Sequence, residues 1–166
     1  MEPQYVPEVD VLIAVVRYLH SEGWTIESLS VAHGAGIDSV SSKNRVKVEL
    51  AKLGIEWNSV RLVSMGEDIR AKKGDILWRI ECKGLAESMK PSTTRNQFDR
   101  ALASVVSYYD QTHGLQLGLA LPEEYFKHIK VRLPQALRTA LSLWVLLYVS
   151  ADNNVVAFAP DEGLPF

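Results

Sequence analysis

Apolar residues recur at helical spacing near the start of the chain and predict an amphipathic helix over residues 7–22. The apolar positions are Val9, Leu12, Ile13, Val16 and Leu19, and spacings of three and four residues place them on one helix face. Gly23 follows at a position where helices commonly end. The pattern then favours a strand over residues 24–32 and a glycine-containing loop over residues 33–36.

The middle of the chain predicts a second helix, a strand and a hairpin. Residues 41–53 have a helical pattern, with Ser41 or Ser42 as the cap and Gly54 at the end. Residues 56–64 indicate a strand. Two further strands, over 69–71 and 76–82, flank the polar turn Lys72-Lys73-Gly74-Asp75.

The second half begins with the longest predicted helix, over residues 94–110. Thr94 and Gln97 have the spacing of a capping box. One apolar face is predicted to contain Phe98, Ala101, Leu102, Val105, Val106 and Tyr109. After it the pattern predicts a buried strand (115–121), helical turns interrupted at Pro134 (123–142), and a hairpin of strands 143–150 and 155–159 that turns at residues 152–154.

Length and composition indicate one soluble globular domain that spans residues 1–166. The chain has 47% hydrophobic and 23% charged residues and a formal net charge of -2, so any nucleic-acid contact needs a local basic patch. A single cysteine, Cys82, excludes an intramolecular disulfide and favours a reducing, cytoplasmic location. The first residues do not have the pattern of a secretory signal, and the apolar stretch 143–149 is too short to span a bilayer.

The hairpin sorts its residues onto two faces. If the loop is even-numbered and Ala71 lies opposite Ile76, Asp68 lies opposite Arg79 and diagonal to Glu81. Alternation then gives a core face with Ile69, Ala71, Ile76, Trp78, Ile80 and Cys82, and a polar face with Asp68, Arg70, Leu77, Arg79, Glu81 and Lys83.

The polar face has the residue types of a metal-assisted phosphodiester hydrolase. Two carboxylates on adjacent strands, Asp68 and Glu81, can converge on one hard cation, with Mg²⁺ (or Mn²⁺) as the natural candidate. Lys83, two residues beyond Glu81, could stabilise a charged phosphate or position the attacking water. A Glu-x-Lys triplet by itself is more often a solvated charge pair, so its place after an Asp-bearing hairpin carries the argument.

The segments Gly66-Glu67-Asp68-Ile69 and Ile80-Glu81-Cys82-Lys83-Gly84 resemble the motif of the PD-(D/E)xK nuclease superfamily. The resemblance implies an α/β fold with a restriction-endonuclease-like core and a mixed central sheet flanked by helices. It implies metal binding by Asp68 and Glu81 and assistance by Lys83 in the attack on phosphorus. The superfamily core is a helix, a three-stranded meander, a crossing helix and a further strand, which leaves helix 41–53 as an insertion and residues after 121 unplaced.

Three positions near this motif leave alternatives open. Glu67 stands where the superfamily usually has proline. Glu8, on the first helix, could add a carboxylate to the metal site, as in some relatives, or it could serve only the helix dipole. Gln97 could be an accessory site residue or only part of the capping box.

Several cations in the same part of the sequence could hold the backbone of a nucleic acid, and we take Arg70, Arg79, Lys90, Arg95 and Arg100 as candidates. The sequence therefore predicts a Mg²⁺-dependent deoxyribonuclease, in a context of restriction, repair, recombination or mobile elements. DNA is the expected partner, no membrane is expected, and a homodimer stays open. The alternative is a non-catalytic nucleic-acid-binding or assembly subunit with a nuclease-like fold.

Overall fold

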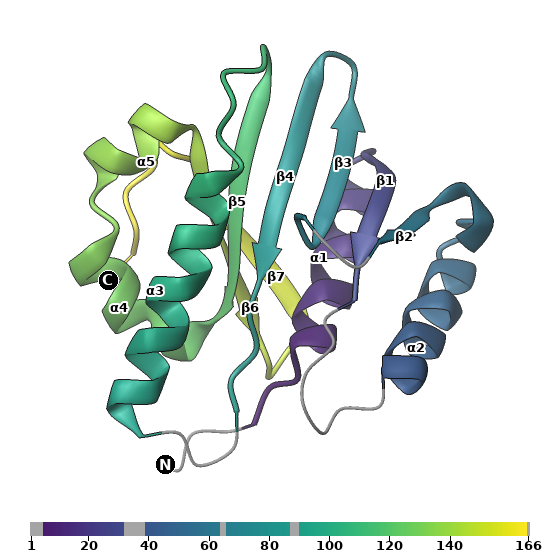
Figure 1. Cartoon of the computed structure of the whole chain (residues 1–166), viewed down its shortest axis with the longest axis horizontal. Helices are drawn as coiled ribbons and strands as arrows, with labels where there is room; N and C mark the ends of the chain where they lie inside the picture. Colours follow the sequence, from purple (N-terminus) through teal and green to yellow (C-terminus); the bar gives the residue numbers. More distant parts are fainter. Residues whose placement is uncertain (1–4, 32–38, 64–65, 87–89, 166) are drawn as a thin grey trace.

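A computed structural model of the chain describes residues 5–31, 39–63, 66–86 and 90–165. One mixed sheet of seven strands, in the order β2-β1-β3-β4-β5-β6-β7, lies between helices (Figure 1). The α/β class and the mixed sheet flanked by helices are as predicted. The predicted loop over residues 33–36 lies outside the described residues.

The first part of the fold forms a meander of three antiparallel strands. Helix α1 (Glu8–Ser21) precedes strand β1 (Thr25–Ser30), and β1 pairs antiparallel with β3 (Ile69–Lys73), which pairs antiparallel with β4 (Ile76–Cys82). Between β1 and β3 the chain forms helix α2 (Ser39–Lys52), the short helix η1 (Trp57–Ser59) and edge strand β2 (Arg61–Val63), which is parallel to β1.

The second part adds parallel strands to the meander. Helix α3 (Pro91–Ser107) crosses to β5 (Leu115–Pro122), which pairs parallel with β4. Then η2 (Glu123–Tyr125), α4 (Phe126–Arg132) and α5 (Gln135–Leu141) lead to β6 (Leu143–Val149), parallel to β5, and to β7 (Asn154–Phe158). The order from α1 to β5 is the core order that the superfamily resemblance implies, and residues after β5 extend the sheet by two strands.

Helices cover both faces of the sheet. Figure 1 shows α1 behind the strands and α3 in front of them, with β4 running downward to its carboxyl end. The apolar stripe of helix α1 is buried, as expected for an amphipathic helix on a sheet. Its residues Val11, Leu12, Val15, Val16 and Leu19 are almost fully inaccessible. None of the described helices is long and apolar enough to cross a membrane.

The hairpin register differs from the prediction by two residues. Ala71 pairs with Trp78 and Lys73 with Ile76, so the turn has two residues, Gly74 and Asp75. Gly74 has a φ of +58°, which suits the first turn position of a type II′ hairpin and costs glycine little. Since a shift of two residues preserves alternation, Ala71, Trp78 and Ile80 are buried on one face as predicted.

Four local predictions are wrong. Within the predicted strand 56–64, the described residues 56–63 contain η1 and the short β2 rather than one strand. Helix α2 begins before Ser41, so neither predicted serine is its cap. Helix α3 begins at Pro91 with Lys90 as its N-cap, which removes Gln97 from a capping box. On α3, Val106 and Tyr109 are exposed, whereas Tyr108 is buried.

Candidate active site

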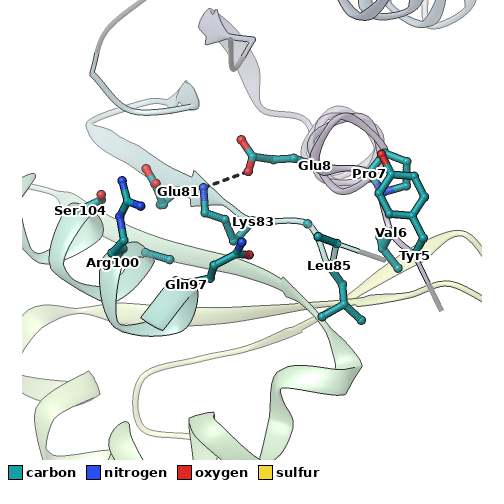
Figure 2. Close-up of a pocket in the computed structure, with 13 residues that line it drawn as sticks. Tyr5, Val6, Pro7, Glu8, Glu81, Lys83, Leu85, Gln97, Arg100 and Ser104 are labelled. Carbon is teal, nitrogen blue, oxygen red and sulfur yellow. Dashed lines mark hydrogen bonds and ion pairs between the residues drawn. The ribbon is translucent and has the colours of Figure 1, made fainter. Parts of the chain in front are cut away.

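An open cleft of about 430 Å³ lies at the carboxyl end of β4. Its walls come from the start of α1, the segment after β4 and one side of α3, and the charged and polar side chains among them belong to Glu8, Glu81, Lys83, Gln97, Arg100 and Ser104. Figure 2 shows these side chains around a common space, with Lys83 reaching between Glu8 and Glu81. Among these charged and polar side chains, the two that are farthest apart in the sequence are Glu8 and Ser104, separated by 96 positions.

Asp68 lies immediately before β3, against the end of β4. Its backbone N–H donates to the carbonyl oxygen of Ile80 at 3.0 Å, and Ile80 is already the register partner of Ile69. Asp68 and Ile69 therefore both lie opposite Ile80, as in a β-bulge. The Asp68 carboxylate accepts the backbone N–H of Cys82 at 2.7 Å, which fixes it next to Glu81 rather than opposite Arg79.

Asp68 and Glu81 are buried carboxylates that repel each other. Each residue is 8% exposed. Burial, followed by the charge of Glu81, raises the pKa of Asp68 well above its usual value, and the Cys82 N–H only partly offsets this. Burial also raises the pKa of Glu81. The site therefore holds two acidic groups whose ionised forms lack sufficient positive charge nearby.

Lys83 follows β4 directly and forms an ion pair with Glu8. Its Nζ lies 3.0 Å from Oε2 of Glu8, and the backbone N–H of Lys83 donates to Ala120 of β5. Although burial alone lowers the pKa of Lys83, the charges of Glu8 and then Glu81 raise it, so the ammonium form is favoured.

Gly84 explains how Glu8 reaches this site. Val6 and Leu85 exchange two backbone hydrogen bonds, at 2.8 and 2.7 Å, which bring the start of α1 against the segment after β4. A Cβ atom on Gly84 would lie 2.4 Å from the carbonyl oxygen of Val6 and 2.5 Å from the backbone nitrogen of Glu8. The glycine after Lys83 is thus needed for the approach that places Glu8 at the cleft.

Tyr108 is a site residue that the sequence analysis missed. Its hydroxyl donates to Oε2 of Glu81, and the side chain of Ser104 also hydrogen-bonds to Glu81. Burial and the neighbouring carboxylate raise the pKa of Tyr108, so the phenol stays a donor. The helical pattern favoured Tyr109 for the buried face, whereas the structure buries Tyr108 and exposes Tyr109.

Two of the predicted DNA-binding residues, Arg70 and Arg79, are engaged with carboxylates. Both donate to Glu67, at 3.2 and 3.1 Å, and Arg70 also pairs with Glu27 while Arg79 pairs with Asp110. Burial by itself raises the pKa of Glu67, but hydrogen bonds from Arg79 and Arg70 bring it below its usual value. We call these five residues the ion-pair cluster.

The remaining predicted residues occupy two sides of α3. Arg100 and Gln97 line the cleft, and Gln97 accepts a hydrogen bond from the Tyr125 hydroxyl at 3.3 Å. Arg95 is exposed and lies 3.9 Å from Asp99. Lys90, at the helix N-terminus, is also exposed.

The donor set fits an open magnesium site better than a closed metal cage. Among the described residues, no group of three or more His, Cys, Asp or Glu side chains is arranged to hold a metal ion. Magnesium commonly takes only one or two protein carboxylates, and water and substrate phosphate supply its other ligands. Asp68 and Glu81, buried together without sufficient counter-charge, suit that mode of binding.

Comparison with known proteins gives one structural likeness. No protein-family model and no curated protein matches the sequence. The structure is similar to the crystal structure of an XisH family protein from Nostoc punctiforme PCC 73102, with 15% sequence identity and a TM-score of 0.47, over 89% of this chain and 96% of that chain. At 15% identity this likeness concerns the fold alone.

Proposed function

We propose that this chain is a Mg²⁺-dependent (or Mn²⁺-dependent) deoxyribonuclease of the PD-(D/E)xK type, which hydrolyses DNA phosphodiester bonds at the cleft beside β4. The observation that carries the proposal is the pair of buried, mutually repelling carboxylates, Asp68 and Glu81, beside the ammonium group of Lys83. A cation that binds between these carboxylates would raise the free energy of unfolding of the protein, and the cation's remaining ligands can come from a phosphate.

Each residue has a separate task in this proposal. Asp68 and Glu81 would hold the cation, which when bound would supply positive charge to the phosphate and help to activate a water molecule. Lys83 offers its positive charge where negative charge develops on the phosphate. Glu8 holds Lys83 by the 3.0 Å ion pair, and Arg100 extends the positive charge along the wall of the cleft.

The alternative is a non-catalytic nucleic-acid-binding or assembly subunit with the same fold. The specific observation in its favour is the ion pair of Lys83 with Glu8, since a lysine neutralised by a carboxylate is less available to a phosphate. In that case Arg100 and the cleft would contact nucleic acid without turnover.

The first prediction separates these two functions. Asp68→Asn and Glu81→Gln should abolish Mg²⁺-dependent or Mn²⁺-dependent nicking of plasmid DNA and remove the rise in Tm that saturating Mg²⁺ gives the unaltered chain. At a Mg²⁺ concentration a hundred times the Kd, that rise corresponds to about 2.7 kcal/mol. Lys83→Met should retain the rise in Tm but lose cleavage by about a hundredfold or more.

Asp75→Asn is the matched carboxylate control, because Asp75 is exposed in the turn at the other end of the same hairpin. Lys52→Met on α2 is the lysine control. Cleavage that persists in EDTA, or in all three site variants, would rule out the mechanism. DNA binding without cleavage across supercoiled, linear and single-stranded substrates would instead support the binding subunit.

A further inference from the structure

Helix α4 belongs to a long segment without acidic residues. Between Glu124 and Asp152 the sequence contains the cations Lys127, Lys130, Arg132 and Arg138 and no aspartate or glutamate. The whole chain, in contrast, has a net charge of -2. Positive charge is therefore concentrated on this part of the molecule, which the proposed chemistry does not require.

Contacts with α3 determine which side of α4 faces outward. His128 stacks on Phe98 of α3, with ring centroids 5.8 Å apart, and Arg132 forms a 2.6 Å ion pair with Asp99. Figure 1 shows α4 beside the lower half of α3. Because these contacts occupy one side of the helix, its outward side holds Lys127, Lys130 and Val131, and Val131 is 80% exposed.

Most of the cations on α2, unlike those on this outward side, have a partner. Among the four α2 cations, Arg45 pairs with Asp10, Lys52 pairs with Glu49, and Lys47 lies over the Trp57 ring, while Lys43 has no such contact with the described residues. Lys127 and Lys130, in the part of the chain that the structure describes, have no ionic or aromatic partner. The nearest acids in sequence, Glu123 and Glu124, lie one turn earlier on η2 and form no ion pair with them.

Helix α3 connects this surface to the cleft. Arg100 lines the cleft on one side of the helix, and Arg95, 61% exposed, lies near Asp99 on the side toward α4. Asp99 is the acid between them, and its carboxylate is already paired with Arg132. A chain of cations therefore runs from the cleft over α3 to α4.

From these contacts we propose that Lys127 and Lys130 of α4, together with Arg95, bind the sugar-phosphate backbone of the DNA that flanks the phosphodiester in the cleft. This inference rests on the proposed function, because it takes the cleft as the place of the reacting phosphate. A polyanion suits the surface because its phosphates supply the partners that Lys127 and Lys130 lack, and displaced counterions favour binding.

The test measures binding of a short fluorescein-labelled DNA duplex of mixed sequence by anisotropy in EDTA, over a range of salt concentrations. The double variant Lys127→Ala/Lys130→Ala is compared with Lys43→Ala/Lys52→Ala on α2, which changes the net charge equally. The α4 variant should bind on the order of tenfold more weakly, and its plot of log K against log[salt] should be shallower by about one to two units. The α2 variant should bind like the unaltered chain.

Equal salt slopes for the two double variants, or no binding of the duplex by the unaltered chain, would overturn the inference. Cleavage is measured separately with Mg²⁺, so a failure of this inference can be distinguished from a failure of the proposed function. If the unaltered chain cleaves DNA but the α4 variant binds DNA with an unchanged salt dependence, the proposed nuclease function stands and the proposed α4 surface is ruled out. If the unaltered chain does not cleave DNA but the α4 variant has the shallower salt slope, the α4 surface is supported and the nuclease function is ruled out.

Discussion

Two neighbouring residues, Glu67 and Asp68, are both buried and stand in opposite electrostatic surroundings. Both are 8% exposed. Glu67 lies in the ion-pair cluster, where two arginines approach within 3.2 Å and lower its pKa. Asp68 faces Glu81, and burial together with that carboxylate raises its pKa.

The difference separates structural charge from functional charge. A buried carboxylate with matched arginines has its charge compensated within the fold. Two buried carboxylates side by side destabilise the ionised form until a proton or a cation binds. Strongly perturbed groups of the second kind, located beside a cleft, are typical of sites that bind a ligand or perform chemistry.

The largest effect on stability is expected from the ion-pair cluster. Glu67→Gln removes the charge that Arg70 and Arg79 share, and both guanidinium groups are partly buried. Hydrogen bonds to charged groups contribute about 1.5–3 kcal/mol each in protected positions, so we expect the free energy of unfolding at pH 7 to fall by about 2 kcal/mol. Urea denaturation in EDTA measures the change.

Glu27→Gln gives the graded control, because Glu27 contacts only Arg70 within this cluster and is more exposed. Glu27→Gln should lower the free energy of unfolding by less than Glu67→Gln does. If Glu67→Gln were as stable as the unaltered chain, the cluster would not be the stabilising element that the comparison requires.

The opposite sign is expected for Asp68→Asn. A carboxyl whose pKa is higher in the folded state binds more protons there than in the unfolded chain, so its contribution to stability falls as pH rises. The destabilisation by the Asp68 charge develops above the pKa of aspartate in the unfolded chain, which is about 4. It is largest once the pH exceeds the raised pKa of Asp68 in the folded state. Removing the charge should therefore stabilise the metal-free protein at pH 8, by on the order of 1 kcal/mol.

The measurement is the difference in urea stability between Asp68→Asn and the unaltered chain, in EDTA, at pH 4, 6 and 8. Asparagine retains an oxygen that can accept the Cys82 N–H, so the contrast reports on charge. The difference should be near zero at pH 4 and grow toward pH 8. A variant less stable than the unaltered chain at every pH would show that Asp68 is held by compensating interactions, like Glu67.

Periodicity predicted the elements that carry the site, because their apolar stripes are long and regular. Helix α1, strand β4 and the middle of α3 follow from residues such as Leu12, Trp78 and Phe98. The alternation on β4 also placed Glu81 on the opposite face from Trp78 and Ile80, even though the predicted register was wrong by two residues. Such a shift does not change which face a side chain occupies.

The sequence alone did not predict the contact between residues far apart in the chain, or which side of the end of α3 faces the core. The contact between Glu8 and Lys83 joins residues 75 positions apart and depends on the crossing at Gly84, which one sequence does not reveal. At the end of α3, Tyr108 and Tyr109 differ by a single 100° step, and the pattern favoured the wrong one. The helix start was misplaced because Pro91 suits the first helical position as well as Thr94 suits a cap.

Tyr108 links the two electrostatic regions, and its hydroxyl should have the smallest effect of the changes compared here. Its ring lies 5.1 Å from the guanidinium of Arg79, while its hydroxyl donates to Glu81. Tyr108→Phe keeps the ring and its contact with Arg79 and removes only the hydrogen bond that orients the carboxylate. We therefore expect stability to change by about 1 kcal/mol or less, and the Kd for Mn²⁺ to rise a few-fold because Glu81 is no longer held in position.

Tyr148→Phe is the matched control, since the Tyr148 hydroxyl bonds to Asn153 at the turn between β6 and β7. Both variants lose one phenolic hydroxyl, so the Kd for Mn²⁺, obtained from Tm against metal concentration, separates positioning from packing. A structural role alone would lower the Tm of both variants and leave both Kd values unchanged. A rise in Kd confined to Tyr108→Phe would show that the tyrosine next to the ion-pair cluster holds Glu81 for the cation, so that the compensated region supports the uncompensated one. Equal Kd values would mean that Glu81 keeps its position through burial and Ser104 alone.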